Sequence, residues 1–421
     1  MKINQVLVEG FWGVKNIQFE LNDDFNFIIG PNGVGKTTIL NLITSVFSFD
    51  IDAISRIHFD HATINVTGFD NESYSIEVLK GVGDDDDCII NFQILNIKHN
   101  YKLFSTMFRT ELNDRSEDPF RTRRSMRRFT NLDEARKIIN EILNIVWLPI
   151  GRYNPSAERD YRSSNHINSV DLRLNAVLEN FVKYSSVINK SISNEMAEFQ
   201  KDALISAIDA SYSEGVTHGK GMVTSIDDRN SLMEAFKEVG ISELKYKKRV
   251  SRMFTILDKV AKKMKSGDEH TLTRDEVMNA FSLSRTRYLV ERYNEYKEKK
   301  DSISYKMNLF IRKLNKLFDG RKVFYVSDSN EISFVCGLKD DLSLFDLSSG
   351  EKQLLILIGE VLLNEHNPCI FIADEPEISL HVSWQEMLVD TMSELNSNMQ
   401  LIFATHSPDI VSKRTNKIIS M

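Results

Sequence analysis

The feature that most constrains this chain is a glycine-rich octapeptide, Gly30–Thr37, which follows an apolar run and precedes an apolar helical pattern. Its spacing, Gly-x-x-x-x-Gly-Lys-Thr, is that of a phosphate-binding loop between a strand and a helix. Gly33 and Gly35 let successive N–H groups converge on a phosphate, and the helix dipole adds positive field behind them. The alternative is a glycine-rich turn with an incidental lysine. The flanking strand and helix patterns favour nucleoside triphosphate binding.

Two side chains of this loop have predicted roles of their own. Lys36 is expected to reach the β and γ phosphate oxygens, and Thr37 is expected to hold Mg²⁺. The backbone of the loop and of the first helical turn would contact the phosphates. The predicted nucleotide-binding residues here are Gly30, Pro31, Asn32, Gly33, Val34, Gly35, Lys36, Thr37 and Thr38.

Length and composition set the outer limits. A chain of 421 residues is long enough for two or three domain-sized units. Its formal charge of −7 gives no global case for nucleic-acid binding, so any such contact has to come from a local basic surface. The three cysteines, Cys88, Cys336 and Cys369, are far apart, which fits a reducing cytosol. No apolar run is long enough to cross a bilayer, so we expect a cytoplasmic protein that does not associate with a membrane.

An antiparallel β region is predicted for the first hundred residues, because apolar residues alternate over several short stretches. Phe11 and Trp12 lie between two glycines and either approach the nucleotide base or plug the core. The acidic run Asp84–Asp87 is predicted to be a solvated turn rather than a metal site. The patterned stretches are 6–8, 17–21, 25–30, 58–66, 74–78 and 89–95.

Two arginine-containing segments suggest phosphate contacts. Residues 119–130 hold five arginines and two phenylalanines with no acid among them. Arginine binds phosphate bidentately and phenylalanine stacks on bases, so this segment either contacts a nucleic acid or forms a solvated loop. Arg152 follows a predicted buried strand at 145–150, and it either faces a phosphate or lies at the surface. The five clustered arginines are Arg121, Arg123, Arg124, Arg127 and Arg128.

A charged block with helical periodicity occupies about residues 165–318. We predict two helical halves that pack on each other, with the lysine-rich stretch Lys245–Arg249 on their surface. No heptad repeat persists for enough turns to predict a long coiled coil. Residues 323–335 are predicted to return the chain to the sheet as a hairpin. The glycines that divide the two halves are Gly215, Gly219 and Gly221.

Two further patterns near the end of the chain suggest phosphoryl-transfer chemistry. Ser348 and Glu351 form a capping-box pattern before an apolar helix, and a capped helix start that contains Gly350 also allows close approach of an anion. A buried strand then ends in Asp374 and Glu375. Phosphoryl transfer needs one carboxylate for the Mg²⁺ shell and another that polarises the attacking water.

His406 ends the last strong strand pattern, 401–405, and Ser407 and Pro408 suit the N-cap and first position of a short helix. A lone histidine is usually structural. This one ends a strand of the same inferred sheet that carries Lys36, so we predict that it belongs to the site.

Together these patterns resemble the ATP-binding cassette ATPases of the SMC and RecF type. Asp374–His381 and Ala404–Pro408 resemble more closely the ATPase domain of the OLD (overcoming lysogenization defect) nucleases and related prokaryotic defence ATPases. The resemblance covers the two ends of the chain and implies an α/β P-loop fold of ABC type. That fold has a mixed sheet, an antiparallel N-terminal β subdomain and a large helical insertion. The implied domains are the first half of an ATPase head at 1–155, the insertion at 156–318, and the second half at 319–421.

The same resemblance implies ATP and Mg²⁺ as cofactors and assigns roles to single residues. Lys36 would be the Walker A lysine, Glu375 the catalytic base and His406 the switch histidine, while Thr37 and Asp374 would hold the metal. The signature, which in these ATPases caps ATP bound by a second subunit, would be Ser348, Ser349, Gly350 and Glu351.

Two departures from the family pattern affect these assignments. Ser349 stands where the signature often has glycine. No glutamine is clearly the Q-loop residue, for which Gln93 and the region of Arg152 are candidates.

The resemblance also implies a function and partners. We expect a homodimer or higher homo-oligomer that acts as an ATP-driven sensor or scaffold in DNA maintenance or anti-phage defence. The OLD nucleases continue into a TOPRIM domain that this sequence does not show, so a separate effector such as a TOPRIM or HNH nuclease is expected. A scaffold with little turnover and a transporter ATPase subunit are the alternatives. Glu375 argues against the first, and the helical insertion argues against the second.

Overall fold

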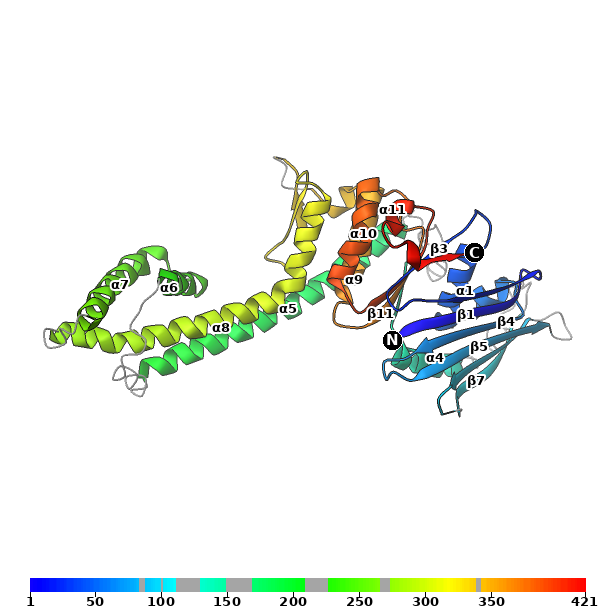
Figure 1. Cartoon of the computed structure of the whole chain (residues 1–421), viewed down its shortest axis with the longest axis horizontal. Coiled ribbons are helices and arrows are strands. Elements are labelled where there is room, and N and C mark those ends of the chain that lie inside the picture. Colours follow the sequence, from blue (N-terminus) through cyan, green and yellow to red (C-terminus); the bar gives the residue numbers. More distant parts are fainter. Residues whose placement is uncertain are drawn as a thin grey trace, which may run out of the picture. The chain divides into compact units, whose positions relative to one another are not determined.

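The computed structural model describes most of the chain and groups it into two compact units. One unit is formed by Met1–Val182 together with Leu309–Met421, and the other by Lys183–Asn308 (Figure 1). The clustered arginines, Arg152 and the acidic run Asp84–Asp87 lie outside the described residues. The described ranges are 1–82, 88–99, 101–110, 129–148, 169–208, 226–265, 273–337 and 342–421.

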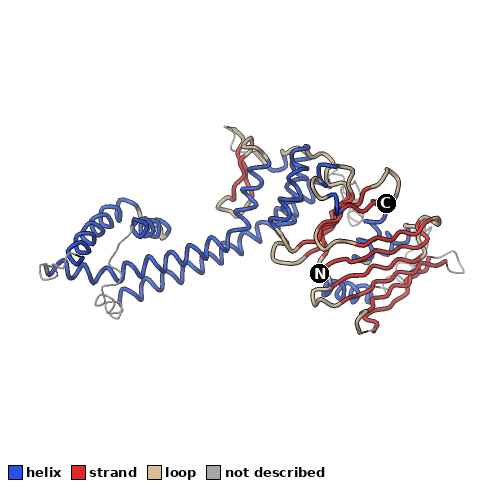
Figure 2. The backbone as a smooth tube through the Cα atoms, viewed as in Figure 1, coloured by secondary structure: helices blue, strands red, loops and turns tan. Residues whose placement is uncertain are grey.

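An antiparallel sheet of six strands forms the first layer of the larger unit (Figure 2). Buried and half-buried side chains alternate along its strands, so one face packs against the core, as the sequence pattern predicted. Helices α1 (Lys36–Ser48), α2 (Ile51–Arg56) and α4 (Phe129–Ile142) supply residues such as Ile43, Ile54 and Ile139 to the same core. In spatial order the strands are β2 (Lys15–Glu20), β1 (Lys2–Phe11), β4 (His61–Thr67), β5 (Ser73–Val82), β6 (Cys88–Asn96) and β7 (Tyr101–Thr110).

A second sheet has five parallel strands and positions the site. Strands β11 and β12 are buried along almost their whole length, which explains their continuous apolar runs. Because β12 lies between β3 and β11, the segments that follow these three strands meet at one edge. The predicted combination of parallel and antiparallel strands is confirmed, and the two kinds separate into two sheets. The spatial order is β13 (Ile418–Ser420), β3 (Phe25–Ile29), β12 (Met399–Ala404), β11 (Cys369–Asp374) and β8 (Ile145–Leu148).

Strands β9 (Val323–Val326) and β10 (Ile332–Val335) form the predicted hairpin, but the prediction that it joins the main sheet is wrong. The side chain of Asn315 accepts a hydrogen bond from Phe324 N (2.6 Å) and donates one to Phe324 O (3.0 Å). These bonds occupy backbone groups at the edge of β9 that another strand would otherwise use. The Phe324 ring also packs on Phe318, with centroids 4.6 Å apart.

Helices pack around the parallel sheet, and the first turns of α5 (Ser169–Ile208) contact α9 (Ser349–Leu363). Lys352 pairs with Asp171 at 2.7 Å, and a Cβ on Gly359 would lie 2.7 Å from Val177 Cγ1. The predicted domain division at 155/156 and 318/319 stays a prediction. The helices wholly within this unit are α1 (Lys36–Ser48), α2 (Ile51–Arg56), α4 (Phe129–Ile142), α9 (Ser349–Leu363), α10 (Val382–Leu395) and α11 (Pro408–Val411), with 3-10 turns η4 (Leu344–Asp346) and η5 (Thr415–Lys417).

The second unit is helical, as predicted for the insertion. Helices α5 and α8 are continuous over 40 and 44 residues. They pack through Phe199 and Tyr293, whose centroids are 5.8 Å apart, and through the ion pair Lys299–Glu195 at 2.7 Å. The long helices are thus paired by aromatic and charged contacts. The helices of this unit are α5 (Ser169–Ile208), α6 (Ile226–Glu238), α7 (Glu243–Lys265) and α8 (Arg274–Leu317), of which α5 and α8 extend into the first unit.

Candidate functional site

The glycine loop joins β3 to α1 and depends on two glycines. Gly33 (φ 78°) and Gly35 (φ 109°) adopt left-handed backbone conformations that favour glycine. A Cβ on Gly35 would also lie only 2.8 Å from Phe11 Cε1. The first turn of α1 contains no acidic residue, so nothing there neutralises the positive end of the helix dipole. The loop therefore has the backbone shape and the field of an anion cradle, with Pro31, Asn32 and Gly33 exposed at its tip.

Phe11 and Trp12 differ in their surroundings: the core interpretation is confirmed for Phe11, and an approach of Trp12 to the nucleotide base stays a prediction. Phe11 is fully buried and belongs to the core, whereas Trp12 is 41% exposed. The rings stack with centroids 4.7 Å apart. Lys15 Nζ lies 5.3 Å from the Trp12 ring centroid and donates a hydrogen bond to Val34 O (2.9 Å). Trp12 therefore stands at the rim of the glycine loop.

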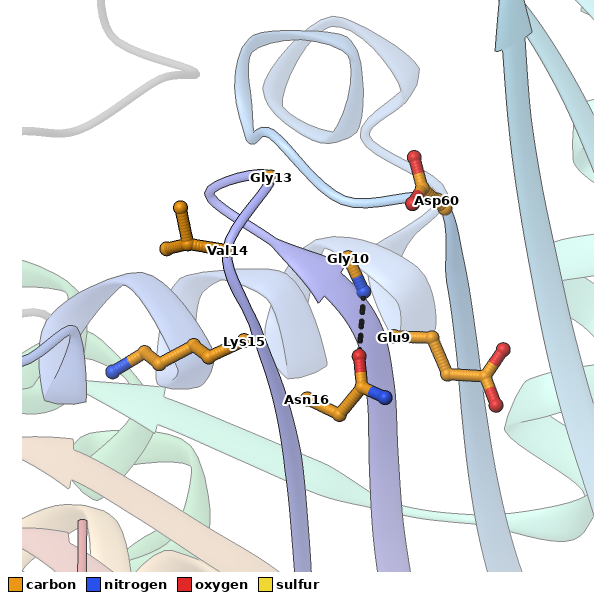
Figure 3. Close-up of a pocket in the computed structure, with 7 residues that line it drawn as sticks. All are labelled: Glu9, Gly10, Gly13, Val14, Lys15, Asn16 and Asp60. Carbon is orange, nitrogen blue, oxygen red and sulfur yellow. Dashed lines mark hydrogen bonds between the residues drawn. The ribbon is translucent and has the colours of Figure 1, made fainter.

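The turn that carries Trp12 borders a shallow polar pocket (Figure 3). Gly10 N donates to Asn16 Oδ1 at 3.0 Å, which closes the turn between β1 and β2. Gly10 has a left-handed backbone, φ 63°, and a Cβ there would overlap the Asp60 carboxylate, so both the backbone and the space favour glycine. The residues that line this pocket therefore shape the turn between β1 and β2, and this turn holds Trp12 beside the glycine loop.

Lys36 and His406 meet across the parallel sheet edge. Lys36 is 6% exposed, and its Nζ donates to Gly30 O (2.9 Å) and Pro31 O (3.3 Å). Its Nζ also lies 2.7 Å from His406 Nε2. A lysine ammonium can only donate, so Nε2 must accept and the ring proton is assigned to Nδ1. The structure thus brings the Lys36 ammonium and the His406 ring together beside the glycine loop.

Asp374 ends β11 at the same sheet edge and has an unsatisfied oxygen. Its carboxyl accepts a hydrogen bond from the side chain of Thr37. Burial raises the pKa of Asp374, and this hydrogen bond only partly offsets the rise. Oδ1 is buried and has no hydrogen-bond partner among the described residues.

A divalent cation would satisfy that oxygen, and the donors fit Mg²⁺. Carboxylate and hydroxyl oxygens are the ligands this hard cation prefers, and Mg²⁺ is usually held by one or two carboxylates together with substrate phosphates. The described residues contain no cluster of three or more His, Cys, Asp or Glu side chains that would form an all-protein cage. Thr37 and Asp374 are therefore the residues that would hold the metal.

Glu375 is the next residue and has a strained backbone. Its φ is 47°, a left-handed conformation that is uncommon for residues other than glycine, and its N–H donates to Ala404 O at 2.7 Å. Glu375 Oε1 lies 4.0 Å from His406 Nε2. The turn after β11 thus directs the Glu375 carboxylate toward the histidine instead of continuing the strand.

Glu377 is a site residue whose role the sequence reasoning missed. Its Oε1 accepts hydrogen bonds from Thr405 Oγ1 (2.6 Å), His406 N (2.7 Å) and Ser407 N (3.2 Å). One carboxylate oxygen therefore holds the whole segment that carries the histidine. The only signal in the sequence was an acid two positions beyond Glu375, with no indication of what it would contact.

Gln385 of α10 adds a second connection between the same two segments. Its Nε2 donates to Leu380 O (2.9 Å), and its Oε1 accepts from Ser407 Oγ (2.6 Å). Ser407 caps α11 and Pro408 begins it, as predicted. Residues 375–381 and 405–407 are thus joined by two side chains.

The predicted signature forms the start of α9. The capping box between Ser348 and Glu351 is confirmed in both directions. Although burial opposes it, hydrogen bonds from Lys322 and Ser348 hold the pKa of Glu351 below its ordinary value. Ser348 and Ser349 are exposed. Within the described residues, no hydrogen bond or ion pair joins this helix start to Lys36.

Gly350 is needed for packing against the segment after β11. A Cβ at this position would lie 2.1 Å from Ser379 O, and Ser379 has a left-handed backbone, φ 68°. Gln353 Nε2 also donates to Pro376 O at 3.1 Å. The start of α9 therefore rests directly on the turn that carries Glu375.

The sequence model of the AAA ATPase domain, AAA_15, matches residues 1–411. The chain belongs to this AAA ATPase family. The matched range includes both halves of the site, from the glycine loop to His406. It follows that the chain is a nucleotide-binding P-loop ATPase.

Three relatives match this ATPase over shorter ranges. It is 27% identical over 195 residues to the Retron Vc95 probable ATPase of Vibrio cholerae, covering 39% of this chain and 36% of the relative. It is 44% identical over 46 residues to the Septu protein PtuA of Bacillus thuringiensis, covering 11% and 12%. It is 38% identical over 65 residues to the DNA replication and repair protein RecF of Haemophilus ducreyi, covering 15% and 18%. In each case the match spans little more than a third of the relative's length, or less.

These similarities confirm the resemblance to RecF and to Retron and Septu ATPases, and the family model confirms the ATPase activity. The parallel sheet and the glycine loop before α1 confirm the α/β P-loop fold class. No helix in the described part of this ATPase is both long and apolar enough to span a membrane. The roles of the individual site residues stay predictions.

Proposed function

We propose that this ATPase binds Mg·ATP between two copies of the chain and that closure of the dimer controls a separate effector, such as a nuclease, in anti-phage defence or DNA maintenance. The observation that carries the proposal is the convergence of Lys36, His406, Glu375 and Asp374 at one sheet edge. The names of the Retron, Septu and RecF relatives support the choice of processes. The chain would act in the cytoplasm.

Each residue has a distinct task in the proposed reaction. The N–H groups of the glycine loop bind phosphate oxygens, and the Lys36 ammonium turns from Gly30 O and Pro31 O toward them. Thr37 and Asp374 hold Mg²⁺, which when bound neutralises charge on the phosphates. Glu375 accepts the proton of the attacking water. Once Lys36 has moved away, the ring proton of His406 shifts from Nδ1 to Nε2, which then donates a hydrogen bond to the γ-phosphate.

The second copy of the chain would complete the site. Ser348 and Ser349 are exposed at a helix start, where backbone N–H groups favour an anion. Within the described residues they make no hydrogen bond to the Lys36 of their own chain. We therefore propose that they cap ATP bound by the partner, in a homodimer or larger homo-oligomer.

The proposal is tested with Glu375→Gln, which removes the base but keeps the size of the side chain. Turnover should fall by about a hundredfold or more while ATP affinity is retained. With Mg·ATP, the variant should accumulate as a dimer in light scattering. The matched control is Glu386→Gln on exposed α10 surface, which should behave as the wild type. Normal turnover by Glu375→Gln would exclude Glu375 as the base.

The same measurement separates the proposal from the scaffold alternative and tests the two-chain site. A scaffold with little turnover would form the ATP-dependent dimer equally well in the wild type and in Glu375→Gln. An unchanged monomeric mass in both proteins, with and without Mg·ATP, would contradict the two-chain site.

A further inference from the structure

Helix α7 carries a face of positive charge in a chain that is acidic as a whole. The helix has nine lysine or arginine residues and two acidic residues, whereas the chain has a net charge of −7. Six of these cations are exposed and make no hydrogen bond or ion pair through their side chains in the described part of the chain. These six, the basic stripe, are Lys245, Lys248, Arg249, Arg252, Lys259 and Lys262.

The stripe occupies one side of the helix. At 3.6 residues per turn its members fall within about 140° of arc and extend over about 26 Å of helix. Tyr246, Val250 and Phe254 lie on the opposite side and are buried against Leu232 of α6 and Val290 of α8. The fold of this unit thus fixes the stripe toward solvent.

Other cations of the same unit form ion pairs with acidic side chains. On α8, Arg287 pairs with Glu291 and Arg292 pairs with Glu295, and Lys297 reaches Glu234 of α6. The stripe instead places like charges three and four residues apart, an arrangement that lowers helix stability. On α7 itself, Glu243 pairs with Lys247, and Asp258 lies at the edge of the stripe. A surface that only had to stay solvated would gain by interleaving acids.

We propose that the basic stripe binds the phosphate backbone of a nucleic acid. A linear row of cations matches a polymer of regularly spaced phosphates, and such contacts release counterions. An anionic membrane is disfavoured because a membrane-surface helix inserts its apolar face, and that face of α7 is buried in the protein. An acidic protein partner is disfavoured because the centre of a protein interface needs a cluster of apolar or aromatic anchors, whereas the stripe offers only Leu244, exposed at its N-terminal end, and the half-buried Ile256.

The test compares two triple variants of the full chain that remove the same charge. The stripe variant is Lys245→Gln, Arg249→Gln, Arg252→Gln. The control is Lys137→Gln, Lys190→Gln, Lys237→Gln, three exposed lysines on other helices. Binding is measured by fluorescence anisotropy across a salt titration with a 30-base-pair DNA duplex, the matching RNA duplex and a single strand.

The wild type should bind at least one of these probes with a steep salt dependence. In the stripe variant the affinity should fall about tenfold or more, and the slope of log K against log salt should flatten by about 2 to 3. The control should keep the wild-type slope. ATP turnover without nucleic acid should be unchanged in both variants, so the result is independent of the ATPase site.

Three results would overturn the proposal. The first is that the wild type shows no salt-sensitive affinity for any of the three probes. The second is that the control loses as much affinity as the stripe variant. In the third, the stripe variant keeps its nucleic-acid affinity but loses binding to phosphatidylserine vesicles or to an acidic protein.

Discussion

Glu377 shows how one residue can determine the geometry of another at this site. Its Oε1 receives three hydrogen bonds from residues 405–407, including the backbone N–H of His406. Removing it leaves Thr405 Oγ1 and His406 N without this acceptor, while Ser407 N keeps only its bond to Thr405 Oγ1 (3.0 Å), and this loosens the segment that carries the histidine. Among the described residues its side chain makes hydrogen bonds to residues 405–407 and none to Lys36 or Glu375, so we interpret Glu377 as a positioning residue.

This role predicts a difference between two substitutions. Glu377→Ala should lower kcat by about 10- to 100-fold with little change in ATP affinity, because a supporting contact is lost rather than a binding group. Glu377→Gln keeps an acceptor oxygen of the same reach and should recover most of kcat. Steady-state kinetics and nucleotide titration check both. Equal loss in the two variants would point to the charge of Glu377 instead of its hydrogen bonds.

At the scale of elements, α9 and the turn after β11 form a single packed unit. Gly350 allows the contact, since any Cβ there would overlap Ser379 O, at 2.1 Å. Gly350→Ala should therefore lower the free energy of unfolding by about 1 to 3 kcal/mol and reduce turnover, because the same turn carries Glu375. Gly81→Ala is the control, as a Cβ there meets no atom within 4 Å. Urea unfolding and ATPase assays measure both effects, and an unaltered Gly350→Ala protein would show that the turn adjusts freely.

Local patterns in the sequence predicted many of these elements, and tertiary contacts explain the misses. Strands that alternate against one core were predictable because their period is two. The prediction missed β7, whose pairing with β6 shifts register between Ile94 and Leu95. The hairpin was placed in the wrong sheet because its edge is capped by Asn315, a contact that no local pattern reveals.

In the candidate site, too, local patterns revealed some residues, and others depend on tertiary contacts. Lys36, Asp374, Glu375 and His406 could be found because each stands at the end of a strand or in a loop with a known spacing. Glu377 could not, since its importance depends on which strand β11 has as its neighbour. Gly350 was predicted to serve an anion, and the structure adds a packing reason that only the fold supplies.

At the scale of the whole molecule, the proposed dimer predicts that each ATP site needs residues from two chains. If two copies form two equivalent sites, each site takes Lys36 from one copy and the exposed start of α9 from the other. Lys36→Ala should abolish productive ATP binding because it removes the lysine of the loop. Ser349→Leu, at an exposed position, should block closure without disturbing the capping box of Ser348 and Glu351. Each variant alone should be inactive.

Mixing the two inactive variants should restore activity. In a heterodimer, one site combines the intact Lys36 of the Ser349→Leu chain with the intact α9 start of the Lys36→Ala chain. Random pairing makes half the dimers mixed, each with one intact site, so turnover should return to about a quarter of the wild-type rate. The measurement is ATP turnover across a titration of one variant against the other. If the mixture remains as inactive as its components while both variants keep their fold by circular dichroism, the site is complete within a single chain and the two-chain arrangement is wrong.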